Sequence, residues 1–257
     1  MKITLLGSGS AYGTPMIFND WRLANPANPK NIRTRAAVLI AEAGKTILVD
    51  AGPDIRAQVN TNQVENIDAV FLTHGHYDHI AGIPELPRAA KILGHGIDVF
   101  ASEETFGEVK KSFGYLFKEK VEAEPDSKKL NWKTLPTLGE FDCLGLKFKT
   151  FQVPHHSLHS SAFRLGDFAY VTDWEGIPAE GLSVLQGVKT LLIECNNGLY
   201  PEKNGHSDLE NVKKIAALVK PERVILTHLS ARVDYDQTSA VLPDNFELAY
   251  DGMSFEA

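Results

Sequence analysis

Short apolar runs recur along the chain between polar and glycine-rich segments, a pattern that is typical of β-strands. It predicts strands at residues 3–6, 36–41, 46–49, 69–72, 97–101, 146–153, 162–165, 168–172, 191–194 and 224–226. The second and third of these strands form a hairpin, because Glu42-Ala43-Gly44-Lys45 between them supplies a turn. The chain is therefore predicted to be rich in short strands.

Helical periodicity is confined to a few segments. One helix is predicted over residues 103–113, because Ser102 is a suitable N-cap and two glutamates follow it. A second is predicted over residues 208–219 and ends before Pro221, and Pro53 can open a short third helix. The apolar residues of the second helix recur at helical spacing: Leu209, Val212, Ile215, Ala216 and Val219. Because strands come in runs with helices interspersed, we expect one α+β domain over residues 1–257, with two sheets flanked by helices.

Two segments lack apolar periodicity. Residues 11–34 are rich in proline and asparagine, which predicts a long loop, and long ordered loops are often functional. Residues 118–133 are highly charged, which predicts a solvated excursion at the surface.

Composition and charge narrow the class of protein. The 257 residues are 43% hydrophobic and 23% charged, which is ordinary for a globular protein, and the net charge of −7 with no dense Lys/Arg run argues against an extended nucleic-acid surface. Neither Cys143 nor Cys195 lies in a Cys-x-x-Cys pair, so we expect no disulfide framework and no thiolate zinc site. The first apolar run is too short for a signal peptide, and no run is long enough to span a membrane. We expect a cytoplasmic protein without membrane contact and leave open a homodimer.

The richest chemistry lies in His74-Gly75-His76-Tyr77-Asp78-His79, directly after the apolar run 69–72. Three imidazoles and a carboxylate within six residues form the mixture of nitrogen and oxygen ligands that Zn²⁺ and similar divalent ions prefer. A polar surface loop is the alternative interpretation. Other polar side chains also follow apolar runs: Asp50, His155 and His156, Asp173, and His228. This repetition at strand ends favours a metal site over isolated surface residues.

These residues resemble the metallo-β-lactamase superfamily over nearly the whole chain. The resemblance rests on Asp50, on His74-x-His76-x-Asp78-His79, and on a later histidine, Asp173 and His228. It implies a four-layer αββα fold that holds two divalent metal ions, Mn²⁺ or Zn²⁺, at one edge of the sandwich. It also implies one metal held by His74, His76 and His156, a second held by Asp78, His79 and His228, and Asp173 between them. Asp50 would orient ligands by hydrogen bonding.

The third histidine of the first set is ambiguous, because His155 and His156 are adjacent. We favour His156, since His156-Ser157 followed by the strand 162–165 is similar to the pattern in the family. His155 would then point to the other side of an extended chain.

Three further strings resemble the phosphoribosyl cyclic phosphodiesterases (PhnP) of this superfamily. They are Asn204-Gly205-His206-Ser207-Asp208-Leu209, Leu226-Thr227-His228-Leu229-Ser230 and the segment 242–253. The resemblance implies a metal-dependent hydrolase that opens a small phosphodiester, of which a cyclic, ribose- or nucleotide-type diester is favoured, to a phosphomonoester. It makes His206 catalytic, although a surface position beside a helix N-cap is the alternative. The chain departs from the family at its extra structural zinc, because no cysteine precedes Cys143 and Ala231 replaces a ligand; we expect no such zinc.

The expected mechanism follows from these roles. Hydroxide formed at the two metals attacks phosphorus in line, Asp78 holds a metal and orients the nucleophile, and His206 protonates the leaving alkoxide. Arg33 and Arg35 are candidates to bind a distal phosphate, with solvated surface charge as the alternative. Ser8, Ser10 and Tyr12 are expected near the same opening.

Three alternatives remain open. An RNase Z-like tRNA 3′-processing endonuclease shares the hexapeptide but needs a basic arm, and residues 118–133 are of mixed charge. A thioester or lactone hydrolase has the same fold. A non-catalytic relative that binds a metal or a nucleotide would be expected to have lost ligands, whereas all seven ligand candidates are present here.

Overall fold

The computed structural model describes residues 1–117 and 130–257. It contains two seven-stranded sheets. The first has the order β14-β1-β2-β3-β4-β5-β6, and the second has the order β13-β12-β11-β10-β9-β8-β7. The strands of the first sheet are β1 (Lys2–Gly7), β2 (Ala37–Glu42), β3 (Lys45–Val49), β4 (Ala69–Phe71), β5 (Ile97–Ala101), β6 (Leu130–Thr134) and β14 (Ser254–Glu256). Those of the second are β7 (Leu138–Cys143), β8 (Leu146–His155), β9 (Leu158–Leu165), β10 (Phe168–Val171), β11 (Thr190–Glu194), β12 (Arg223–Thr227) and β13 (Phe246–Leu248).

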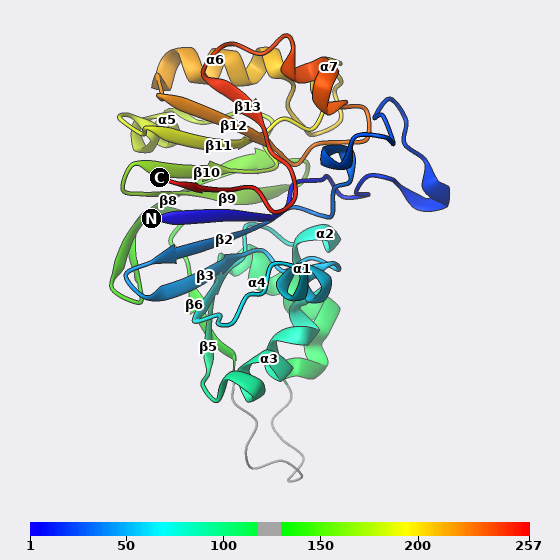
Figure 1. The fold of residues 1–257 in the computed structure, drawn as a ribbon. Helices are drawn as coiled ribbons and strands as arrows, with labels where there is room; N and C mark the ends of the chain where they lie inside the picture. Colours follow the sequence, from blue (N-terminus) through cyan, green and yellow to red (C-terminus); the bar gives the residue numbers. More distant parts are fainter. Residues whose placement is uncertain (118–129) are drawn as a thin grey trace.

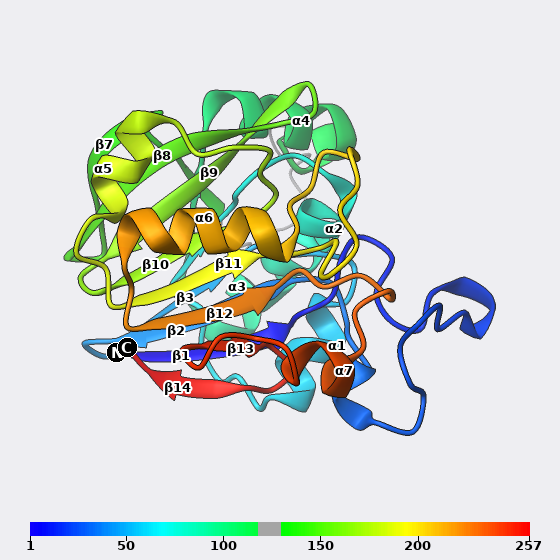
Figure 2. The same ribbon diagram turned by 90° about the horizontal axis from the view of Figure 1, so that it is seen from above.

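Helices cover the outer faces of both sheets. On the first sheet lie α1 (Ile55–Thr61), α2 (Tyr77–Ile80), α3 (Leu86–Leu93) and α4 (Glu103–Phe113). On the second lie α5 (Ala179–Leu185), α6 (Leu209–Val219) and α7 (Tyr235–Ser239). Figure 1 shows the four layers in order, and Figure 2 shows α6 lying over the second sheet, alongside β11 and β12. The predicted α+β class and four-layer αββα arrangement are confirmed.

Three apolar clusters fill the spaces between these layers. One lies between the sheets, where the ring of Phe163 contacts those of Phe71 and Phe148 at centroid distances of 4.9 and 5.3 Å. A second lies under the helices of the first sheet, and a third lies under α5 and α6. The alternation of strand residues explains this division, because successive side chains point to opposite faces of a sheet and both faces here are covered.

Most predicted elements are present. Helix α4 begins after Ser102, whose hydroxyl accepts a hydrogen bond from the Thr105 amide at 3.1 Å, and α6 begins after Asp208. The early loop, residues 11–34, forms two short 3₁₀ turns, η1 (Ile17–Asn19) and η2 (Pro29–Asn31), and no regular helix or strand. Within residues 1–117 and 130–257, none of the helices has the length and apolar character that a membrane span needs.

One prediction is wrong in part. Residues 118–129 of the predicted surface excursion lie outside the described residues, but residues 130–133 belong to β6, which pairs in parallel with β5. The polar composition of β6 hid the strand, and polar or charged side chains are usual on edge strands because they discourage pairing with other chains.

Candidate metal centre

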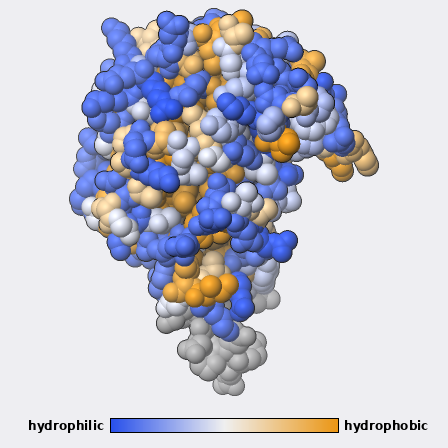
Figure 3. Space-filling view, viewed as in Figure 1, coloured by the Kyte–Doolittle hydropathy of each residue, from blue (hydrophilic) through white to orange (hydrophobic). Residues whose placement is uncertain are grey.

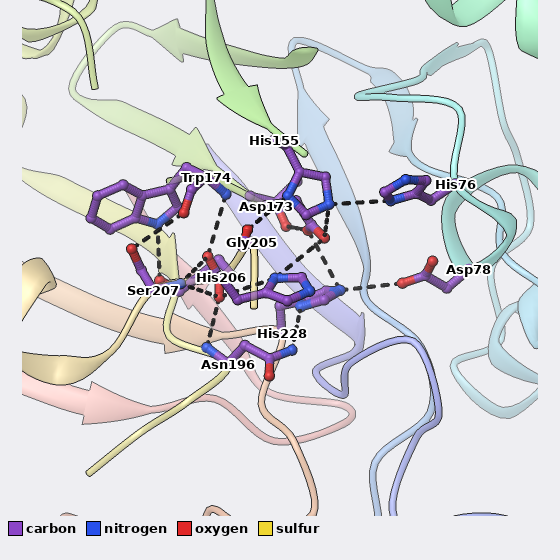
Figure 4. A network of polar contacts seen from close by, with 12 residues as sticks. His76, Asp78, His155, Asp173, Trp174, Asn196, Gly205, His206, Ser207 and His228 are labelled. Atoms are coloured by element: carbon purple, nitrogen blue, oxygen red, sulfur yellow. Dashed lines mark hydrogen bonds and ion pairs between the residues drawn. The ribbon is translucent and has the colours of Figure 1, made fainter. Parts of the chain in front are cut away.

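The sheet topology brings the polar strand ends together at one edge of the sandwich. Strands β3 and β4 are parallel, so Asp50 and the hexapeptide lie side by side at their carboxyl ends. Strands β10, β11 and β12 are also parallel, and two antiparallel steps through β9 give β8 the same direction. His155, Asp173 and His228 therefore meet at that edge, and Figure 4 shows their side chains converging from separate segments.

A first group of side chains contains three histidines and one carboxylate: His74, His76, His155 and Asp173. The Nδ1 atom of His76 lies 3.0 Å from His74 Nε2 and 3.1 Å from His155 Nε2. Asp173 Oδ2 lies 3.8 Å from His74 Nε2 and 3.5 Å from His155 Nε2. One ligand atom from each residue lies within 4.8 Å of the others, which is close enough to surround one cation.

The first group contains His155 and not His156, for which the sequence pattern gave a preference, so the geometry favours His155 as the third histidine. Strand β8 was predicted to end at Val153 but continues through His155, so its alternation buries Val153 and His155 together. His155 is 1% exposed, whereas His156 is exposed in the turn that follows, with φ of 51°. His156 lines the same cavity as His155, and one of its ring nitrogens lies within 4.8 Å of ligand atoms of His155 and His206.

A second group contains Asp78, His79 and His228. Asp78 Oδ2 lies 3.1 Å from His79 Nε2 and 3.2 Å from His228 Nε2. On the far side of the ring, His79 Nδ1 lies 2.7 Å from Asp50 Oδ2. Asp50 also accepts hydrogen bonds from the Thr73 amide at 2.8 Å and from its hydroxyl. Asp50 thus fixes the orientation of His79, which is the contact expected of it.

Asp173 lies between the two groups. Its Oδ2 faces the first group, and its Oδ1 lies 3.5 Å from His79 Nε2 and 3.4 Å from His228 Nε2. The residue has φ of 49°, a left-handed conformation that is uncommon outside glycine and asparagine. Asp50 and His228 share this feature, with φ of 64° and 55°. Such backbone conformations concentrate at functional sites, where the surrounding structure holds them.

The donor set fits divalent cations. Ring nitrogens approach one another at 3.0–3.1 Å in the first group, and His79 Nε2 makes no hydrogen bond within the described residues although it is fully buried. Burial disfavours charge on Asp173, yet His228, His79 and His74 hold the pKa of that carboxyl well below its usual range. Burial also keeps the pKa of His74 well below its usual value, and neutral imidazole is the form that binds a metal.

His206 lies beside both groups, on the segment that precedes α6. Its ring stacks on that of His228 at a centroid distance of 5.3 Å, and its Nδ1 lies 3.8 Å from Asp173 Oδ2 and 3.5 Å from Glu194 Oε1. Burial lowers the pKa of His206, but Glu194 and Asp173 outweigh it and raise the pKa to about 9. His206 is therefore placed to hold a proton next to the metal centre.

Glu194 is a residue of the site that sequence reasoning missed. It ends β11 and is fully buried, and its carboxylate accepts hydrogen bonds from the amides of Asn196 at 2.8 Å and Ser207 at 3.2 Å. Asn196 was missed as well, and its Nδ2 lies 3.3 Å from His228 Nδ1. The sequence did contain one signal for Glu194. This residue follows the apolar run 191–193, as Asp173 follows β10.

The centre lies at the base of a cavity of about 690 Å³. Ser10, Tyr12 and Arg35 line this cavity, as expected from their positions, but Ser8 is buried and donates two hydrogen bonds to Asp251. Arg33 does not reach the cavity. Its guanidinium is buried and donates to Asn31 Oδ1 and to the carbonyl oxygens of Val233 and Ser230. This position fits neither of the two roles considered for Arg33, a phosphate ligand or a solvated surface charge.

Comparisons with known proteins agree with this fold. Residues 45–229 match the family model of the β-lactamase superfamily domain. The chain is 29% identical over 98% of its length to the octanoyltransferase of Porphyromonas gingivalis, but it spans only 51% of that relative. It is also 24% identical over 80% of its length to 85% of the ribonuclease Z of Metallosphaera sedula. Among solved structures, a diphosphatase from the PhnP family superposes with a TM-score of 0.89 at 28% identity, covering 100% of this chain and 97% of the other.

Proposed function

The chain belongs to the metallo-β-lactamase superfamily, and from this membership we propose that it is a metal-dependent hydrolase of a small phosphodiester, which it opens to a phosphomonoester. Two divalent ions, Mn²⁺ or Zn²⁺, are the proposed cofactors, and a cyclic, ribose- or nucleotide-type diester is the proposed substrate class. The chain spans about half of the first curated relative, so the name of that relative describes a longer protein.

One observation carries the proposal. Asp173 directs one carboxylate oxygen at each of two ligand groups, and both groups open into a cavity of about 690 Å³ with Arg35 in its wall. That volume is within the usual range of about 300–1,000 Å³ for small-molecule sites. Two metals about 3.5–4 Å apart suit displacement at phosphorus, because one can stabilise the attacking oxygen and the other the leaving oxygen.

The residues of the site would have three roles: to hold the ions, to orient their ligands and to donate a proton. His74, His76 and His155 would hold one ion, Asp78, His79 and His228 the other, and Asp173 both; the ions supply Lewis acidity and a water of lowered pKa. Asp50 fixes the ring of His79, and the carbonyl of Gly205 fixes that of His155 at 2.9 Å. His206 lines the cavity beside both groups and is the proposed proton donor to the leaving oxygen, and Glu194 favours the protonated form of its ring.

The test compares His206→Ala with the unaltered protein after loading with Mn²⁺. We expect both to retain about two equivalents of metal. Turnover of a ribose cyclic phosphate should fall by about 10²- to 10⁴-fold, the usual contribution of a general acid. Turnover of bis-p-nitrophenyl phosphate should fall less, because p-nitrophenolate leaves without a proton.

His95→Ala is a matched control, since His95 is bonded to Asn66 and to the Gly96 carbonyl away from the cavity. A loss of metal in His206→Ala would make His206 a ligand and contradict its assigned role. Hydrolysis of a thioester or lactone by the metal-loaded protein, with no phosphodiester turned over, would refute the proposed function.

A further inference from the structure

An arm formed by residues 16–22 projects from the early loop beyond both sheets. Figures 1 and 2 show it as the deep blue segment at the right of each view, and Figure 3 shows apolar side chains at its tip. Phe18 is 94% exposed and Ile17 is 78% exposed, and Tyr12, 72% exposed, lies in the loop just before the arm. Side chains of this kind are usually buried. Their exposure together on one projection is typical of a binding site.

The arm borders a second cavity. This cavity adjoins the one of about 690 Å³ at the metal centre, the metal cavity. This arm pocket has a volume of about 570 Å³ and is lined by Tyr12, Met16, Ile17, Phe18, Asp20, Arg22 and Arg35. Tyr12, Met16 and Arg35 also line the metal cavity. Because the two cavities share these walls, a ligand with one end at the metals can extend its other end onto the arm.

The tip of the arm is a built turn. The Met16 amide donates to the Asp20 carbonyl at 2.8 Å, and the Trp21 indole donates to Asn19 Oδ1 at 3.1 Å. Within this turn Phe18 and Asn19 have φ of 61° and 59°. A bulky residue in the left-handed region is a genuine outlier, and such outliers persist where function requires them. In this left-handed conformation the turn holds the Phe18 ring outward, where it is exposed.

Arg35 stands between the two cavities in a fixed position. Its Nε donates to the Ala11 carbonyl at 3.1 Å, and its Nη1 pairs with Asp54 Oδ2 at 3.2 Å. Within the part of the chain that the structure describes, Nη2 of Arg35 donates no hydrogen bond. A guanidinium anchored on one side and open on the other suits an anionic or carbonyl group of a ligand that passes from one cavity to the other.

We propose that the arm pocket binds the heterocyclic base of a nucleotide-type phosphodiester whose phosphorus lies at the metal centre. This inference rests on the proposed function. Phe18 supplies a ring face for stacking, Tyr12 a second aromatic surface, and Arg22 and Asp20 polar groups at the rim. A protein partner fits less well, because the charged residues interrupt the apolar tip and the pocket leads into the metal cavity.

The kinetic test compares two diesters that share the p-nitrophenolate leaving group. One is the p-nitrophenyl ester of thymidine 5′-phosphate, and the other is methyl p-nitrophenyl phosphate, which has no base. We expect Phe18→Leu to lower the ratio of their kcat/KM values by about 5- to 100-fold, the range that stacking on one aromatic ring gives. Phe18→Trp should keep the ratio. Leu23→Ala, on the same loop but outside the arm pocket, should leave it unchanged.

A binding measurement separates this inference from the proposed function. Calorimetry on the metal-loaded protein should show thymidine 5′-phosphate binding at least about fivefold tighter than ribose 5-phosphate, and Phe18→Leu should remove the difference. If the base is preferred but no diester is hydrolysed, the proposed function fails and the base site stands. Turnover without any preference for the base overturns the base site, as does failure of both phosphates to bind. A dimer that Phe18→Leu converts to a monomer, with the preference unchanged, would instead make the arm a contact between copies.

Discussion

The ring of His155 is fixed from both ends. Its Nδ1 lies 2.9 Å from the Gly205 carbonyl, which sets this nitrogen as the donor and leaves Nε2 free to face His76 and Asp173. A carbonyl that orients a ligating imidazole in this way is a usual companion of metal sites. The amide of His156, by contrast, donates to Glu175 at the surface at 2.7 Å.

The two adjacent histidines should therefore respond differently to substitution. We expect His155→Ala to lose one of two bound metals, or to bind it about 10- to 100-fold more weakly if a neighbour substitutes, and to lose most activity. We expect His156→Ala to keep both metals. Elemental analysis of the two purified variants after equal metal loading is the measurement, and retention of two metals by His155→Ala would restore His156 as the ligand.

Glu194 gives a second prediction at this scale. Burial without a counter-charge is costly for a carboxylate, but three backbone amides, those of Asn196, Ser207 and Trp174, point at this one. Glu194→Gln keeps the shape and removes the charge beside His206. We expect metal content to hold while turnover of diesters with alkyl leaving groups falls by at least about tenfold, with a smaller loss for p-nitrophenyl esters. Equal losses for both leaving groups would show that Glu194 acts on something other than proton donation.

The early loop is held in place by polar contacts with the segment after β12. The Ala231 carbonyl accepts hydrogen bonds from the amides of Leu23 and Ala24, each at 3.1 Å. Asp234 accepts from the Asn25 amide and the Asn31 side chain, each at 2.8 Å, and also caps α7 through the Gln237 amide. The Arg33 guanidinium adds to this network by donating hydrogen bonds to Asn31 Oδ1 and to the Val233 carbonyl. The wall of both cavities thus depends on contacts that involve no substrate.

Asp234→Ala tests this anchoring. Loss of a buried acceptor with three donors should lower the free energy of unfolding by about 1–3 kcal/mol and raise KM more than it lowers kcat, because the loop lines the cavity. Burial raises the pKa of Asp234, but the Gln237 and Asn25 amides and the Asn31 side chain outweigh it, so the pKa is lowered. A carboxyl with a lowered folded pKa contributes stability above its unfolded pKa of about 3.9 that is lost as the pH falls through the folded value. Denaturant unfolding between pH 3 and 7 should show a flatter profile for Asp234→Asn than for the unaltered protein.

The strands that the sequence predicts differ in burial from those that it does not predict. Strands such as β4 and β11 are buried on both faces and carry unbroken apolar runs, so composition alone reveals them. Strands β6 and β7 are half exposed, and their polar residues mask the alternation. The candidate ligand residues could be singled out because they follow apolar runs. His156 was favoured on its similarity to a family pattern. The position of His155 within the strand could not be predicted, because Pro154 interrupts the apolar run although β8 continues past it.

The site joins the two halves of the whole molecule. Asp50 and the hexapeptide come from the first sheet, whereas His155, Asp173 and His228 come from the second. Imidazoles and carboxylates from both sheets are buried face to face at this edge. The apolar cluster between the sheets also joins the two halves, as do backbone hydrogen bonds from the Ser161 amide to the Thr73 carbonyl and from the Leu229 amide to the Ser8 carbonyl, each at 2.8 Å. Cations bound there would add an attraction that the unfolded chain lacks.

Removal of metal should therefore lower the stability of the entire fold. A ligand at about a hundredfold excess over its Kd stabilises the folded state by about 2.7 kcal/mol, and a chain of this size shifts by about 2–4 °C for each kcal/mol. We expect treatment with a chelator to lower Tm by about 5–10 °C, and Mn²⁺ or Zn²⁺ to restore it. The double variant His74→Ala and His228→Ala should show no response to chelator. An unchanged Tm in the unaltered protein would contradict metal binding at this edge.

Overall charge separates a small-molecule hydrolase from a tRNA nuclease with the same fold. The chain has 26 basic and 33 acidic side chains, so its long-range field repels a polyanion, and a tRNA nuclease must overcome that with a concentrated basic surface. A protein that makes 6–10 phosphate contacts loses about 10³- to 10⁵-fold in affinity between 50 and 200 mM salt. We expect fluorescence anisotropy to detect no binding of tRNA at 150 mM salt. Hydrolysis of a mononucleotide diester should vary only a few-fold over the same range, because one or two charge contacts release few counterions. Tight tRNA binding with a steep salt dependence would favour the nuclease, and the arm would then contact RNA rather than a single base.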